Sequence, residues 1–153
     1  VGQLGQRGKV RPDGDQILEG VGEAARELFK RKSSRGVIVL FTVYGENKQT
    51  VDPEDVLRDL KNSSASLNAM YLAGANAAQM IGDGPRQSGG RIEMINAGSG
   101  IVPAASKIAN SLLHQMTVTY TLPEGVKPAD RLQLTSTRRD VKLVYPTRIP
   151  DKF

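Results

Sequence analysis

Apolar residues recur at helical spacing in three stretches of the chain. Residues 17–29 place them at i, i+1, i+4, i+7, i+8, i+11 and i+12, which lines one face of an α-helix. Residues 101–114 repeat this spacing and have Pro103 in the first turn, where the missing N–H costs nothing. Between them, Asp52 can cap a shorter helix that has Pro53 in its first turn. The pattern therefore predicts three helices.

Strand-like stretches follow each predicted helix. Residues 37–43 form an apolar run, residues 67–73 are rich in apolar side chains, and residues 116–122 alternate with a period of two. The segments 131–137 and 141–145 predict a further strand pair around a turn. The alternation of helices and strands favours an α/β fold, a parallel doubly wound (Rossmann-like) sheet with flanking helices and a C-terminal antiparallel strand pair.

The whole chain, residues 1–153, is expected to form a single domain. Residues 1–12 are a poorly structured lead-in, and residues 124–153 are a C-terminal strand extension. The segment 74–100 is rich in glycine and forms the longest irregular stretch, although a short strand at 91–95 would fit inside it.

The first predicted strand raises a question about the edge of the sheet. An all-apolar strand such as 37–43 belongs in the middle of a parallel sheet, with both faces covered. Residues 1–10 are too weakly patterned to pair with its free side, and an exposed apolar edge favours aggregation. We therefore expect the sheet to continue into a preceding stretch of a longer chain or into a second subunit.

Composition narrows the function classes. The absence of cysteine excludes disulfides, thiolate metal sites and cysteine nucleophiles, and no apolar run is long enough to span a membrane. The net charge of +5 allows nucleic-acid binding, but the basic residues are scattered and few aromatic residues lie among them. His114 is the single histidine, and no G-x-S-x-G motif supplies a nucleophile for it, so no catalytic residues are predicted.

The order of four stretches resembles the second half of a von Willebrand factor type A (VWFA) domain, and especially a divergent bacterial subgroup of secreted proteins. These stretches are DGDQILEGVGEAARELFKR, RGVIVLFTVYGE, SGGRIEMINAGSG and the segment from IANSLLHQ to YPTRIP. The resemblance implies that residues 37–43, 67–73 and 116–122 are the fourth, fifth and sixth strands of a type A sheet. The first three strands of that sheet would precede this chain.

The resemblance also implies a metal site that has degenerated. Many type A domains bind Mg²⁺ or Mn²⁺ through oxygen ligands at the carboxyl ends of their strands, and the ion in turn binds an acidic residue of a partner. Thr42 and Gly45 match the T-D-G turn after the fourth strand, but Tyr44 stands near the position of the ligand aspartate, and Asp15 lies where a threonine is usual. Glu46 could only substitute as an oxygen donor. We expect no cofactor, and Mg²⁺ only if preceding residues complete a site.

Two functions follow from these observations. The first is a non-enzymatic, adhesion-type interaction module that binds a protein partner through a loop face formed by Asp15, Thr42, Tyr44 and Glu46. Self-association through the open sheet edge is a further expectation. The alternative is a nucleic-acid or polyanion binder, with nucleic acid the less favoured partner. The resemblance implies an extracellular or periplasmic location. The residues of the alternative polyanion site are Arg138, Arg139, Lys142 and Arg148.

Overall fold

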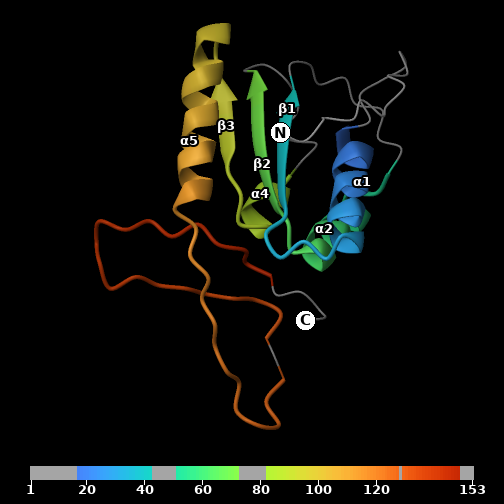
Figure 1. Ribbon diagram of the computed structural model, residues 1–153, viewed down its shortest axis with the longest axis vertical. Coiled ribbons are helices and arrows are strands. Elements are labelled where there is room, and N and C mark those ends of the chain that lie inside the picture. Colours follow the sequence, from blue (N-terminus) through green and yellow to red (C-terminus); the bar gives the residue numbers. More distant parts are fainter. Residues whose placement is uncertain (1–16, 43–50, 73–81, 128, 149–153) are drawn as a thin grey trace.

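Three parallel strands form the central sheet, in the spatial order β1-β2-β3. The computed structural model describes residues 17–42, 51–72, 82–127 and 129–148 (Figure 1). Helix α5 lies on one face of the sheet, and α1 and α2 lie on the other. The elements are α1 (Ile17–Lys30), β1 (Val37–Thr42), α2 (Pro53–Ser63), β2 (Ser66–Leu72), α4 (Gly84–Gln87), β3 (Ile92–Ile95), the 3₁₀ turn η1 (Gly98–Gly100) and α5 (Ile101–Leu113).

The three helices predicted from apolar spacing are confirmed. Asp52 caps α2, because its side-chain oxygen accepts a hydrogen bond of 2.9 Å from the backbone N–H of Glu54. Pro53 occupies the first turn of that helix, and Ser64 ends it in a left-handed conformation. No helix in the described ranges is both long and apolar enough to cross a membrane.

The larger of two apolar cores lies between the sheet and the α1–α2 layer. Small residues bring these layers close together, since Ala25 of α1 and Ala69 of β2 are completely buried. Gly36 belongs to this contact, because an added Cβ would lie 3.1 Å from side-chain atoms of both Leu28 and Ala65. The buried members are Leu18, Val21, Ala25, Ile38, Val56, Leu60, Ala65, Leu67 and Ala69.

The second core lies on the α5 face of the sheet. It consists of Met70, Ile95, Ala104 and Ile108, which come from β2, β3 and α5. An ion pair lies beside this second core: Lys107 of α5 and Glu93 of β3 are 3.1 Å apart. Since side chains alternate across a strand, β2 contributes to both cores and is the buried middle strand.

A Gly-Gly corner between α4 and β3 lets β3 reach the sheet. A Cβ on Gly90 would overlap the carbonyl oxygen of Leu67, so only glycine permits this approach to β2. Gly89 has a φ of +76°, and an added Cβ would lie 2.6 Å from the backbone nitrogen of Pro146. The Ser88 hydroxyl strengthens the corner by accepting a 2.9 Å hydrogen bond from the N–H of Leu67.

The third strand of the sheet is the short strand expected at 91–95 rather than the one expected at 116–122. Residues 116–122 were expected to enter the parallel sheet, but they form no strand, and Ile92–Ile95 pairs with β2 instead. The pair expected at 131–137 and 141–145 is likewise absent as strands in the described residues. The described residues after α5 run as long extended loops away from the sheet (Figure 1).

Two isolated antiparallel bridges fasten the end of this segment. They join Ser88 to Pro146 and Arg131 to Arg148. In addition, the N–H of Thr147 donates to the carbonyl of Gln87 at 3.0 Å. The C-terminal extension is therefore held against the Gly-Gly corner at one place, whereas the predicted lead-in 1–12 lies outside the described residues.

Substitution at two glycines tests the packing of the corner. Gly90→Ala should lower the free energy of unfolding by about 1–3 kcal/mol or more, because the new Cβ meets backbone that has no side-chain freedom to move away. Gly20→Ala in α1 is the matched control, since nothing lies within 4 Å of its added Cβ. Helix propensity should make that variant about 0.5–1 kcal/mol more stable. Urea unfolding measures the free energy of unfolding of both variants. Equal values for Gly90→Ala and Gly20→Ala would contradict the close approach of Gly90 to Leu67.

Candidate functional site

The predicted loop face is only partly within the described residues. Thr42, the last residue of β1, is buried, with 7% of its surface exposed, and the residue has an interaction partner. Asp15, Tyr44 and Glu46 lie outside the described ranges, so whether they meet Thr42 stays a prediction. Within the described residues, no cluster of three or more His, Asp or Glu side chains could hold a metal ion. The degenerate metal site therefore remains an expectation.

His114 ends α5 as the sequence predicts. Its Nδ1 donates a 2.7 Å hydrogen bond to the carbonyl oxygen of Asn110, one turn earlier in the helix. A histidine in this position satisfies a free carbonyl at the helix C-terminus and complements the helix dipole. This bond gives the single histidine a structural role.

The four basic residues of the polyanion alternative are not equivalent. Arg138 forms a fork with Asp140, with distances of 3.2 Å from Nε and 2.7 Å from the second guanidinium nitrogen to the two carboxylate oxygens. Arg148 instead lies beside α2 and α4. Arg139 and Lys142 are exposed. Because Asp140 forms an ion pair with Arg138, it reduces the positive charge that these four residues could offer a polyanion.

The fork also changes the titration of Asp140. The Arg138 guanidinium, and then the residue's own backbone N–H, hold the pKa of this carboxyl below its ordinary value. The fork is therefore present at neutral pH and is lost as the pH falls through the lowered pKa.

The outer face of β1 carries exposed apolar side chains. Ile38 of β1 belongs to the core under α1 and α2, so Val39 and Phe41 point to the opposite face. Helix α5 covers β2 and β3 there, and it leaves Val39 50% and Phe41 45% exposed. The unbroken apolar run of 37–43 was the signal for this surface, because such a run requires cover on both faces.

The backbone of β1 is equally unpaired along its outer edge. The Gly36 carbonyl accepts a 3.0 Å hydrogen bond from Ser66 of β2, and peptide groups alternate in direction along a strand. The N–H and C=O groups of Val37, Val39 and Phe41 therefore point away from β2. In the described residues no strand pairs with that edge, since β1 ends the strand order.

Strand β3 shows the complementary gap on the other face. Ile95 and Glu93 face α5, so Ile92 and Met94 face the α1–α2 side. They are 41% and 61% exposed. Each outer strand therefore has one uncovered face: the α5 side for β1, and the α1–α2 side for β3.

No protein-family model, curated protein or solved structure matches this chain. The likeness to type A domains therefore remains a prediction from the residues. What the structure adds is a mixed α/β fold with a three-stranded parallel sheet and helices on both faces.

The Arg138–Asp140 fork makes a testable prediction about pH. In an NMR titration of the side-chain carboxyl carbon, Asp140 should titrate below the usual value of about 3.9 for aspartate. Arg138→Gln should raise that midpoint towards the ordinary value, whereas Arg139→Gln should leave it in place. A midpoint that is insensitive to Arg138→Gln would show that the fork does not persist in solution.

Proposed function

We propose that the chain is a non-enzymatic protein-interaction module, similar to the second half of a VWFA domain with a degenerate metal site. The observation that supports this proposal is the uncovered apolar surface of β1, formed by Val39 and Phe41 beside an unpaired strand edge. Aromatic and aliphatic side chains that stand out from a rigid strand are suitable anchors for a polypeptide partner.

The edge of β1 lacks the usual protection against such pairing. Natural edge strands carry lysine, proline, a bulge or an inward charge that discourages a second strand. Residues 37–42 contain no charged residue and no proline, and all six pair in regular register with β2. An added strand would satisfy the outward peptide groups and cover the exposed apolar side chains in one step.

The finer architecture belongs to the same proposal. A polypeptide strand beside β1 would extend the sheet in the direction of a doubly wound type A domain. The segments 131–137 and 141–145 would form their antiparallel pair on a partner surface. No cofactor takes part, and Mg²⁺ does so only if preceding residues complete a site; an extracellular or periplasmic location follows the resemblance. The loop residues Asp15, Thr42, Tyr44 and Glu46 remain a second candidate contact at the carboxyl end of β1.

Site-specific crosslinking tests the proposed surface. A benzophenone side chain at position 41, in the chain produced in its native source, should crosslink one polypeptide that mass spectrometry can identify. The matched control is position 29, since Phe29 of α1 is 57% exposed and lies outside the proposed surface. Equal capture at positions 41 and 29, or no capture at 41, would argue against a partner on β1.

Proline substitutions separate edge pairing from simple apolar contact. Val39→Pro removes an N–H that faces outward, so the fold should survive while crosslinking from position 41 falls several-fold. Leu40→Pro removes an N–H that faces β2 and should destabilise the fold by about 1–3 kcal/mol or more. Thermal unfolding checks the stability of both variants. Unchanged crosslinking in a folded Val39→Pro variant would mean that the partner does not pair with the edge.

A further inference from the structure

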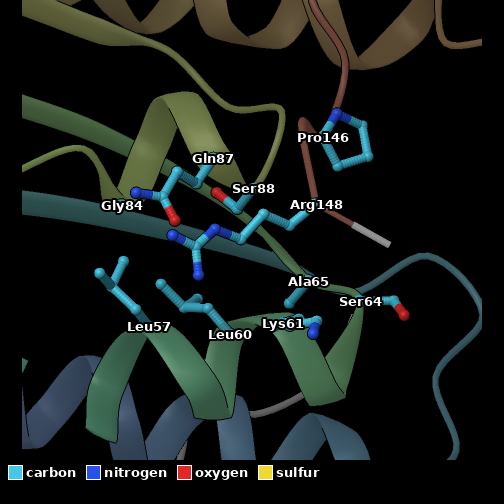
Figure 2. A pocket seen from close by; sticks show the side chains of 10 residues that line it. All are labelled: Leu57, Leu60, Lys61, Ser64, Ala65, Gly84, Gln87, Ser88, Pro146 and Arg148. Carbon is cyan, nitrogen blue, oxygen red and sulfur yellow. The ribbon is translucent and has the colours of Figure 1, made fainter. Parts of the chain in front are cut away.

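A small cavity lies between α2, α4 and the C-terminal segment. Its volume is about 190 Å³, which is below the range of roughly 300–1,000 Å³ usual for drug-sized ligands, so an occupant must be small. Figure 2 shows the cavity with α2 below it and α4 above it. The lining residues are Leu57, Leu60, Lys61, Ser64, Ala65, Gly84, Gln87, Ser88, Pro146 and Arg148.

Hydrogen bonds fix the wall that the C-terminal segment supplies. Thr147 donates to the Gln87 carbonyl at 3.0 Å and accepts from the N–H of Leu132, also at 3.0 Å. The missing Cβ of Gly89 allows Pro146 to approach the corner closely. Pro146 and Arg148 are therefore held opposite α2, although more than eighty residues separate them from it in the sequence.

The chemistry of the lining is that of an apolar pocket with a cationic side. Leu57, Leu60 and Ala65 supply the apolar floor from α2 and the residues that follow it. Arg148 and Lys61 are the two cationic residues of the lining, and none of the lining residues is acidic. The adjoining cavity that extends to α1 does include Glu54 and Asp83, so the cationic lining without acidic residues is confined to the Arg148 side.

Arg148 is the cationic group of the cavity that is best placed to bind a ligand. Figure 2 shows its side chain lying across the cavity, with the guanidinium between α4 and the leucines of α2. Within the described residues this guanidinium has no hydrogen-bond or ion-pair partner. A planar guanidinium beside an apolar floor fits a carboxylate, which it can bind through two parallel hydrogen bonds.

We propose that this cavity binds a small apolar carboxylate. The carboxylate pairs with Arg148, and the apolar body rests on Leu57, Leu60 and Ala65. Two sources share this chemistry, namely a free aliphatic acid and the C-terminal residue of a polypeptide. The site is distinct from the outer surface of β1, so it does not depend on the interaction proposed there.

NMR titration of the full chain tests the proposal. Hexanoate represents the free acid and N-acetyl-leucine represents a chain end, while hexanol and N-acetyl-leucinamide are their uncharged counterparts. We expect one or both acids to shift the methyl signals of Leu57, Leu60 and Ala65 more strongly than the matched neutral compound does. The acid that binds more tightly identifies the source. Absence of shifts up to the solubility limit, or equal shifts with the neutral compounds, overturns the proposal.

Variants at two arginines test the role of the guanidinium. Arg148→Gln should weaken the acid at least about tenfold, the effect of losing one charge-assisted hydrogen bond. Arg148→Lys keeps the charge without the fork and should have an intermediate affinity. Arg139→Gln, an exposed site that does not line the cavity, should bind as the parent chain does. Since Arg148 is exposed, the variants should keep the parent's melting temperature, and unchanged acid affinity in folded Arg148→Gln overturns the assignment.

Discussion

The rest of the structure depends on the close backbone approach at Gly89 and Gly90. Gly90 lies so near the Leu67 carbonyl that no side chain fits between them, and this contact brings the chain to the register in which β3 pairs with β2. Gly89 accepts Pro146 on its other side. One corner therefore decides two things at once: that the third strand is Ile92–Ile95, and that the C-terminal segment returns to α4 to close the small cavity.

A three-stranded sheet with helices on both faces leaves a predictable imbalance. Helices α1 and α2 cover β1 and β2, and α5 covers β2 and β3, so only the middle strand is enclosed on both sides. The outer strands must each expose one apolar face, and they do so at Val39, Phe41, Ile92 and Met94. Hydrophobic burial stabilises each layer locally, but these four side chains gain only part of that stabilisation, since 41–61% of their surface stays exposed. This asymmetry is why we propose a polypeptide partner for β1, where apolar side chains and outward peptide groups coincide.

Local patterns predicted the helices well because each helix satisfies most of its own backbone. The spacing of apolar residues in 17–29 and 101–114, and the Asp52 cap with Pro53, all correspond to observed helices. The same reasoning was wrong for 116–122, since alternation indicates a half-buried strand only where another strand is available for pairing. Met116, Val118, Tyr120 and Leu122 keep the alternation and are 84%, 63%, 47% and 37% exposed. The cavity around Arg148 could not be predicted at all, because its walls come from distant segments joined by the glycine corner.

The attachment of the C-terminal segment determines where a mechanical load would enter the molecule. The described residues between Gln115 and Tyr145 form no helix or strand; a 3.1 Å hydrogen bond joins Gln115 to Arg35, and the N–H of Thr147 donates to the Gln87 carbonyl beyond the other end. A pull on the chain beyond Arg148 would therefore bypass these loops and α5. It would act first on the few hydrogen bonds at the corner, and through Ser88 on the middle strand. The loops between α5 and Tyr145 would extend only after the contacts of Pro146 and Thr147 with Ser88 and Gln87 had broken. The corner would therefore be the first part of the extension to unfold under load.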